Sequence, residues 1–132
     1  MAAVNSEKFD WFEKNSFIKH MGFELVKQGE NDISIKLLID PKHLNTQHDL
    51  HGGVHAAMLD TIQTTALKSI YGARVIAQNL NVHYVTGTDS GDIWAHAKVI
   101  QKGYKIAAVE SEIVDGSNRL IAKGSGVYKI IR

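Results

Sequence analysis

A run of apolar residues at helical spacing occupies the middle of the chain. Apolar side chains recur there about every four positions, in a pattern made of Val54, Met58, Leu59, Ile62, Ala66, Leu67 and Ile70. This spacing predicts an α-helix from about Gly53 to Tyr71, ending before Gly72. Because the apolar residues cover much of its circumference, we expect the helix to be buried.

Two shorter patterns precede this helix. In the segment SEKFDWFEKNSFIKHMGF, apolar residues at spacings of three to five predict a short amphipathic helix that breaks near Asn15 and ends before Gly22. The segment FELVKQGENDISIKLLID then alternates apolar and polar residues on either side of GEND. Alternation around a turn-forming sequence predicts a β-hairpin.

Four more alternating segments follow the helix: RVIAQNLNVHYV, DIWAHAKVI, YKIAAVESEIV and RLIAKGSGVYKII. The stretches QKG and DGSN between the last three are short enough for antiparallel hairpins. The predicted fold is therefore α+β, an antiparallel sheet of five to six strands wrapped around one long central helix. That architecture is the hot-dog fold. We expect one domain over residues 1–132, in which residues 1–21 form an N-terminal helical segment.

The composition narrows the class of protein. A chain of 132 residues can bury its own core, and 44% hydrophobic with 22% charged residues is ordinary for a globular domain. The absence of cysteine excludes disulfides, thiolate nucleophiles and cysteine-ligated metals. A net charge of +1, with acids and bases interspersed, gives no basic patch for nucleic acid. With no signal peptide or membrane-spanning run recognisable, we expect a soluble, cytoplasmic protein without a membrane partner.

Two glycines mark the start of the predicted central helix. Gly52 and Gly53 lack side chains, so their amides can approach a ligand closely. At a helix N-terminus these amides lack intrahelical partners and lie at the positive end of the helix dipole. Such a place can bind an anion, or a carbonyl oxygen that becomes negative during attack. A turn that merely enters a helix is the alternative interpretation.

The central helix also carries an isolated acid. Asp60 is the only Asp, Glu, Lys or Arg between Leu50 and Leu67. A carboxylate in such a segment is a candidate base or nucleophile, and Thr64, one turn later, can hydrogen-bond it or a water. The alternative is a partly exposed aspartate, or one held by a strand arginine or a neighbouring hydroxyl. Asp60 lies eight residues beyond Gly52, about 12 Å along a helix axis, so one carbonyl carbon cannot contact both residues of the same helix. It can contact both only if they come from two chains that are related by a two-fold axis.

Two histidines, His51 and His55, are candidate metal ligands. The i, i+4 spacing of His51 and His55 suits a zinc pair, but the glycines between them disturb the helix there and no glutamate accompanies them. We therefore expect no metal site, with His51 orienting the helix entrance and His55 facing a partner or solvent. In QKGYK, Lys102 and Lys105 can meet phosphates and Tyr104 can lie against an adenine, although a solvated hairpin turn explains the same residues.

Asn45, the His51-Gly52-Gly53 triplet and Asp60 closely resemble the corresponding residues of PaaI-type hot-dog acyl-CoA thioesterases, and the similarity runs from about Gly22 to Val127. The resemblance implies that Gly52 donates its amide to the thioester oxygen. It implies that Asp60 of the opposing subunit acts as general base or nucleophile. Asn45 then helps to hold the water or the carbonyl, His51 supports the loop, and Thr64 helps to position the water.

The same resemblance implies the position of coenzyme A (CoA) and the oligomeric state. It assigns to the neighbourhood of the CoA moiety Asn79, Tyr84 and the segment Gln101, Lys102, Gly103, Tyr104, Lys105 and Ile106. No cofactor is implied, since CoA is part of the substrate, and the implied partner is a second copy in a homodimer or dimer of dimers. His48 stands where many members have glycine, and Ala77 where one branch has a water-assisting serine. These departures bear on rate and substrate preference.

The sequence thus predicts hydrolysis of acyl-CoA thioesters. A thioester carbonyl is already electrophilic and CoA thiolate leaves readily, so one carboxylate and one oxyanion donor suffice. Two alternatives stay open. One is a dehydratase or hydratase of the same fold, which would pair a histidine with an acid at a different spacing. The other is a non-catalytic acyl-CoA-binding domain, which would not require Asp60.

Overall fold

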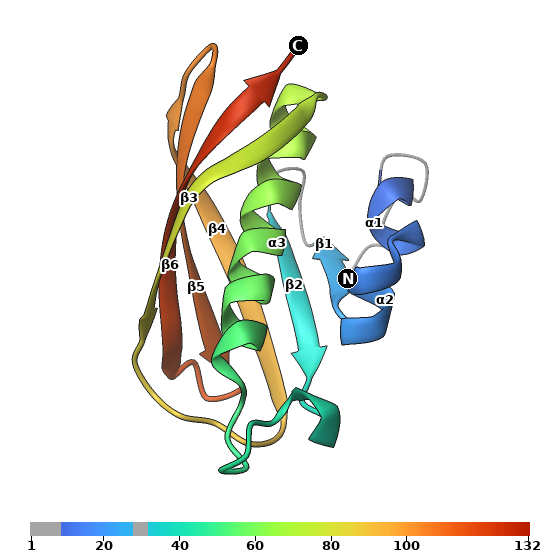
Figure 1. The fold of residues 1–132 in the computed structure, drawn as a ribbon, viewed down its shortest axis with the longest axis vertical. Helices are drawn as coiled ribbons and strands as arrows, with labels where there is room; N and C mark the ends of the chain where they lie inside the picture. Colours follow the sequence, from blue (N-terminus) through green and yellow to red (C-terminus); the bar gives the residue numbers. More distant parts are fainter. Residues whose placement is uncertain (1–8, 28–31) are drawn as a thin grey trace.

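A single long helix lies in the concave face of a curled antiparallel sheet (Figure 1). The computed structural model describes residues 9–27 and 32–132. The helices are α1 (Asp10–Lys14), α2 (Ser16–Met21) and α3 (Gly52–Tyr71), with a 3-10 turn at Pro41–His43. The strands are β1 (Glu24–Lys27), β2 (Ile33–Leu38), β3 (Arg74–Tyr84), β4 (Asp92–Lys102), β5 (Ile106–Asp115) and β6 (Leu120–Ile131). The predicted hot-dog fold is confirmed.

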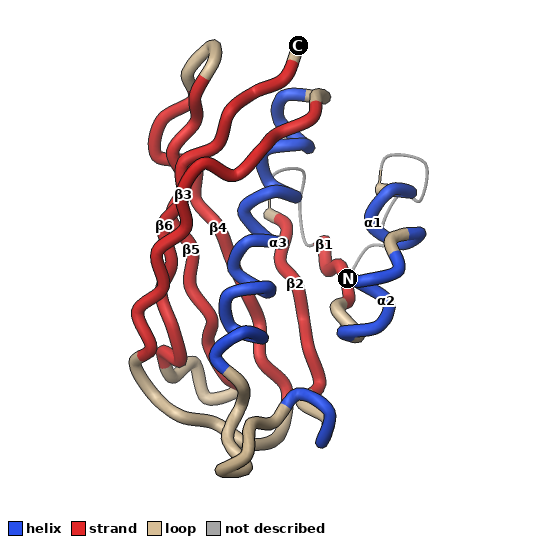
Figure 2. The backbone as a smooth tube through the Cα atoms, in the orientation of Figure 1, coloured by secondary structure: helices blue, strands red, loops and turns tan. Residues whose placement is uncertain are grey.

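The sheet has the order β1-β2-β4-β5-β6-β3, and all neighbouring strands are antiparallel (Figure 2). The predicted hairpin before the helix is confirmed by the pairing of Leu25 with Ile35, while most of its GEND turn lies outside the described residues. β3 returns from the C-terminal end of α3 and pairs with β6 only, so it forms one edge of the sheet. Among the described residues, no helix has the length and apolar character that a membrane crossing requires.

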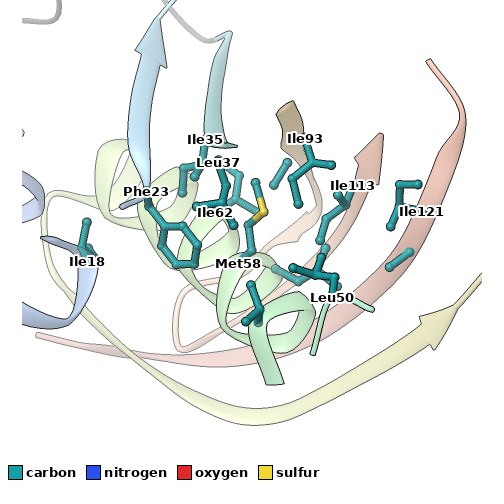
Figure 3. Close-up of a cluster of buried hydrophobic side chains, with 14 of the residues drawn as sticks. Ile18, Phe23, Ile35, Leu37, Leu50, Met58, Ile62, Ile93, Ile113 and Ile121 are labelled. Carbon is teal, nitrogen blue, oxygen red and sulfur yellow. The ribbon is translucent and has the colours of Figure 1, made fainter. Parts of the chain in front are cut away.

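The core lies between α3 and the sheet. Met58, Leu59 and Ile62 of α3 are fully buried, and they belong to the same apolar cluster as Ile35, Ile93 and Ile113 of the strands (Figure 3). Burying such a side chain contributes about 1.5–3 kcal/mol each, which fixes which face of α3 meets the sheet. The helix starts at Gly52, one residue earlier than expected, and ends at Gly72 in a left-handed conformation (φ 62).

Within residues 9–21, the N-terminal segment forms two short helices, while residues 1–8 of the predicted segment lie outside the described residues. The predicted break is at Asn15, whose side-chain oxygen accepts a hydrogen bond from the Ile18 amide at 3.0 Å and so caps α2. Gly22 ends α2 with φ 85, a value that glycine adopts without strain. Phe12 and Ile18 are buried, and the Lys68 ammonium of α3 lies 4.0 Å from the Trp11 ring centre. These contacts hold α1 and α2 beside α3.

Candidate active site

The N-terminus of α3 presents one free amide. His51 is the N-cap residue, and its Nδ1 accepts a hydrogen bond from the Gly53 amide at 2.8 Å. The Gly52 amide has no acceptor among the described residues, whereas the Gly52 carbonyl accepts from the Tyr84 hydroxyl at 3.0 Å. A Cβ at Gly52 would lie 3.2 Å from that hydroxyl oxygen, and one at Gly53 would lie 3.0 Å from His51 Nδ1. Close approach therefore explains both glycines.

His55 corrects one expectation from the sequence. It does not face solvent or a partner, because its side chain is buried, with 5% of the residue exposed. The ring packs edge-on against Tyr84, with centroids 5.1 Å apart, and Nδ1 lies 3.1 Å from the His51 carbonyl oxygen. Burial lowers the pKa of His55 below its usual value. Within residues 9–27 and 32–132, no three His, Cys, Asp or Glu side chains are grouped to hold a metal.

The loop before α3 is held by Asn45. Its Oδ1 accepts hydrogen bonds from the amides of Gln47 at 2.8 Å and Asp49 at 3.1 Å, so the amide nitrogen of the side chain is the group left to meet a ligand. Within this loop His48 has φ 65, in the left-handed region that favours glycine. Glycine adopts this conformation more readily than histidine does.

Asp60 lies half-buried in the middle of α3, with its Oδ1 held from the sheet. The Tyr128 hydroxyl of β6 donates to Oδ1 at 2.7 Å, and the Thr64 hydroxyl reaches the same atom at 3.5 Å, a long contact. Burial and the neighbouring carboxylate raise the pKa of Tyr128, so it stays a protonated donor. Among the described residues, Asp60 forms no ion pair and Oδ2 has no hydrogen-bond partner. The carboxylate is therefore held by hydroxyls, one of the arrangements the sequence left open.

A groove opens beside Asp60. It has a volume of about 430 Å³ and runs between the N-terminal helices and the outer face of α3. Besides Asp60, its walls include Trp11, Phe17, Ile18, Ala57, Thr61 and Thr64. The sequence did not reveal this groove, because helical periodicity does not say which face of α3 the N-terminal helices cover. Its mostly apolar walls suit a hydrocarbon group next to a carboxylate.

The hairpin between β4 and β5 lies at the opposite end of α3 from Gly52 (Figure 1). The Tyr71 hydroxyl at the end of α3 donates to the Gly103 carbonyl at 2.6 Å, and the Arg132 guanidinium lies 4.1 Å from the Tyr104 ring centre. A Cβ at Gly103 would lie 2.2 Å from the Ile106 carbonyl oxygen, so only glycine fits there. The C-terminal end of α3 also has near it the other residues of the predicted CoA segment, among them Gln101, Lys102 and Lys105.

Asn79 lies on the edge strand β3, directly after a bulge that shifts the register between Ala77 and Asn79. Its side-chain oxygen accepts a hydrogen bond from the side-chain nitrogen Nδ2 of Asn81 at 2.8 Å. Apart from Asn79, the predicted site residues form three separate groups within one chain. They are the start of α3 with Tyr84, the groove with Asp60 and Thr64, and the β4–β5 hairpin.

The hot-dog sheet surrounds a helix that carries a free N-terminal amide and, beside a mostly apolar groove, a lone carboxylate. This combination of fold and groups is typical of a hydrolytic enzyme. The family follows from comparison: the chain belongs to the thioesterase superfamily, whose model matches residues 47–122, and it is therefore a thioester hydrolase. The human acyl-coenzyme A thioesterase 13 is 28% identical over 103 residues, which cover 76% of this chain and 74% of that protein.

Solved structures agree with this assignment. Thioesterase HI1161 of Haemophilus influenzae superposes with a TM-score of 0.89 at 25% identity, covering 99% of this chain and 93% of that one. The Escherichia coli PaaI protein, from the phenylacetic acid degradation operon, has the same fold, with a TM-score of 0.87 at 21% identity over 98% of this chain and 97% of that one. The predicted resemblance to PaaI-type hot-dog thioesterases is confirmed.

Proposed function

We propose that this protein hydrolyses acyl-CoA thioesters to a free acid and CoA, with Asp60 as the catalytic carboxylate. The observation that carries the proposal is the setting of Asp60. One carboxylate oxygen is held at 2.7 Å by Tyr128, and the residue lines an apolar groove of about 430 Å³ that can receive an acyl group. Lys68 lines the same groove, but Asp60 forms no ion pair among the described residues. A half-buried carboxylate without such a pair is costly unless it has a task.

The proposed chemistry needs few groups. Asp60 takes a proton from water as the water attacks the thioester carbon, or attacks that carbon itself. The carbonyl oxygen becomes negative in the tetrahedral intermediate and accepts a hydrogen bond from the Gly52 amide, at the positive end of α3. The C–S bond then breaks and CoA leaves as thiolate. Asn45 and Thr64 are proposed to hold the attacking water, and no cofactor is required.

This chemistry requires two subunits. Gly52 and Asp60 are eight residues apart on α3, about 12 Å along its axis, which is too far for one carbonyl group. In a dimer with antiparallel α3 helices, Asp60 of one subunit faces Gly52 of the partner subunit, and two equal sites result. Of the two sheet edges, β1 has four residues and β3 has eleven, and β3 exposes Ile76 and Tyr84. We therefore propose that β3 forms the dimer interface, which a dimer of dimers would retain.

We propose a position for CoA from the same arrangement. The β4–β5 hairpin lies beyond the C-terminal end of α3, about 16 Å along the axis from Asp60 in the same subunit. In the antiparallel dimer, that hairpin lies on the side of the Gly52 amide of the partner subunit, so one extended ligand can span both. We propose that Lys102 and Lys105 meet the phosphates and Tyr104 the adenine, with Gln101, Gly103, Ile106 and Asn79 nearby. Gly53 and Tyr84 shape the oxyanion end.

The test is turnover of purified protein on a series of short, long, branched and aryl acyl-CoAs, with release of free thiol as readout. Asp60→Asn is expected to reduce kcat by several orders of magnitude while the fold remains. Asp92→Asn, at a partly exposed acid whose partner Lys36 lies 3.9 Å away, is the matched control and should hydrolyse like the wild type. Unchanged hydrolysis by Asp60→Asn, or wild-type protein that binds acyl-CoA without turnover, would contradict the proposal.

A further inference from the structure

A chain of buried hydrogen bonds leads from the sheet to Asp60. The Ser111 hydroxyl on β5 donates to Gln63 Oε1 at 2.7 Å, and Gln63 Nε2 donates to the Tyr128 hydroxyl oxygen at 2.9 Å. Tyr128 in turn donates to Asp60 Oδ1 at 2.7 Å. Gln63 and Tyr128 are fully buried and Ser111 is 4% exposed. Throughout the described residues, every buried side-chain nitrogen and oxygen has a partner, so this chain of bonds is complete.

The direction of these bonds has a chemical consequence. Each group donates toward the next, and the last donor is aimed at a carboxylate oxygen. Hydrogen bonds in such a chain polarise one another, which strengthens the last one. A hydroxyl that donates to a carboxylate favours its ionised form. It also fixes the rotation of the carboxyl group, because Oδ1 is bound to the sheet while Oδ2 is left without a partner among the described residues.

Two glycines of β6 make room for this chain of bonds. A Cβ at Gly126 would lie 2.5 Å from Gln63 Nε2 and 2.8 Å from Tyr128 Cε1. A Cβ at Gly124 would lie 2.9 Å from Ser111 Oγ. Glycine inside a strand is unfavourable and marks a close approach. The sequence KGSGVY in β6, which the pattern identified only as a strand, thus accommodates the buried polar groups behind Asp60.

We propose that Tyr128, supported by Gln63 and Ser111, is a positioning residue that fixes the rotation of the Asp60 carboxylate and turns Oδ2 toward the groove. This inference rests on the proposed catalytic role of Asp60. Tyr128 is not a candidate for direct catalysis, because it is fully buried beneath the carboxylate and does not line the groove.

The test is Tyr128→Phe, which removes the hydroxyl and keeps the ring. We expect kcat to fall about tenfold while KM changes little, since the orientation of the carboxylate is lost. The chemical shift of the Asp60 carboxyl carbon at neutral pH, observed by NMR and assigned with Asp60→Asn, should change because its hydrogen-bond donor is lost. Tyr71→Phe, which also removes one phenol hydroxyl, should leave that chemical shift in place.

An unchanged chemical shift of the Asp60 carboxyl carbon in folded Tyr128→Phe would overturn the inference, even if kcat fell. If that variant does not fold because Gln63 Nε2 loses its acceptor, the triple variant Tyr128→Phe with Gln63→Met and Ser111→Ala removes every polar group of the chain of bonds and should show the same change. Because the NMR measurement needs no turnover, the two proposals fail separately. Full activity of Asp60→Asn refutes the catalytic role, whereas an inactive Asp60→Asn beside an unshifted Tyr128→Phe refutes only the role of Tyr128.

Discussion

The oxyanion role of Gly52 can be tested by a substitution that removes its amide N–H. Gly52→Pro deletes the amide N–H at the first position of α3, where proline is tolerated because that amide has no intrahelical acceptor. His51 already has the extended conformation that a residue before proline requires (φ −63, ψ 136). Any side chain at this position also crowds the Tyr84 hydroxyl, 3.2 Å from a Cβ. Gly52→Ala is therefore the matched control, since it adds the same Cβ and keeps the N–H.

The magnitude follows from the geometry. In the described part of the chain, the Gly52 amide is the donor left free at the start of α3, because the Gly53 amide is bound to His51 at 2.8 Å. Loss of a single oxyanion donor costs about 10²–10³ in kcat, or roughly 3–4 kcal/mol of transition-state stabilisation. Steady-state hydrolysis of an acyl-CoA, with melting curves for both variants, measures this difference. If Gly52→Pro and Gly52→Ala lose kcat equally, the Gly52 amide is not the oxyanion donor.

Three further predictions concern stability. His48→Gly should raise the free energy of unfolding by about 1 kcal/mol, because residue 48 has φ 65; urea titration that shows a decrease would contradict this. Gly126→Ala should lower the free energy of unfolding by about 1–3 kcal/mol, because the new Cβ would lie 2.5 Å from Gln63 Nε2. If the variant were as stable as the wild type, the Gln63 side chain would have to move freely. His55 has a pKa below 6.5 when folded, so the unfolded chain binds more protons and stability falls as the pH drops below about 6.5. Urea titrations at several pH values should show that the free energy of unfolding falls less with decreasing pH for His55→Gln than for the wild type. An identical fall would show that His55 does not cause this pH dependence.

The sequence predicted those parts of the fold that depend on local periodicity. The four-residue repeat from Val54 to Ile70 gave α3 to within one residue, since a buried helix needs a continuous apolar face. The one-residue error at its start arises because His51 caps the helix, a role that histidine rarely has. The burial of His55 was available from the same pattern, because spacings of four and seven place it on the face of Leu59 and Ile62.

Contacts between distant segments could not be predicted in the same way. Tyr128 is 68 residues from Asp60, and alternation in β6 indicates only that its side chain points inward. Which inward residue meets the carboxylate depends on the register between β6 and its neighbours and on the angle of α3 across the sheet. The groove likewise depends on how α1 and α2 pack against α3. This packing involves the contact between Trp11 and Lys68, which the sequence pattern does not indicate.

The central claim is that each active site combines Asp60 of one subunit with Gly52 of the other. The most direct test is to form heterodimers between Asp60→Asn and Gly52→Pro chains, each carrying a different affinity tag, and to measure acyl-CoA hydrolysis after tandem purification. Each homodimer should be nearly inactive. In the heterodimer one of the two symmetric sites carries both substitutions and the other carries neither, so about half of the wild-type activity should return. Heterodimers as inactive as the two parents would show that Asp60 and Gly52 do not act across the interface.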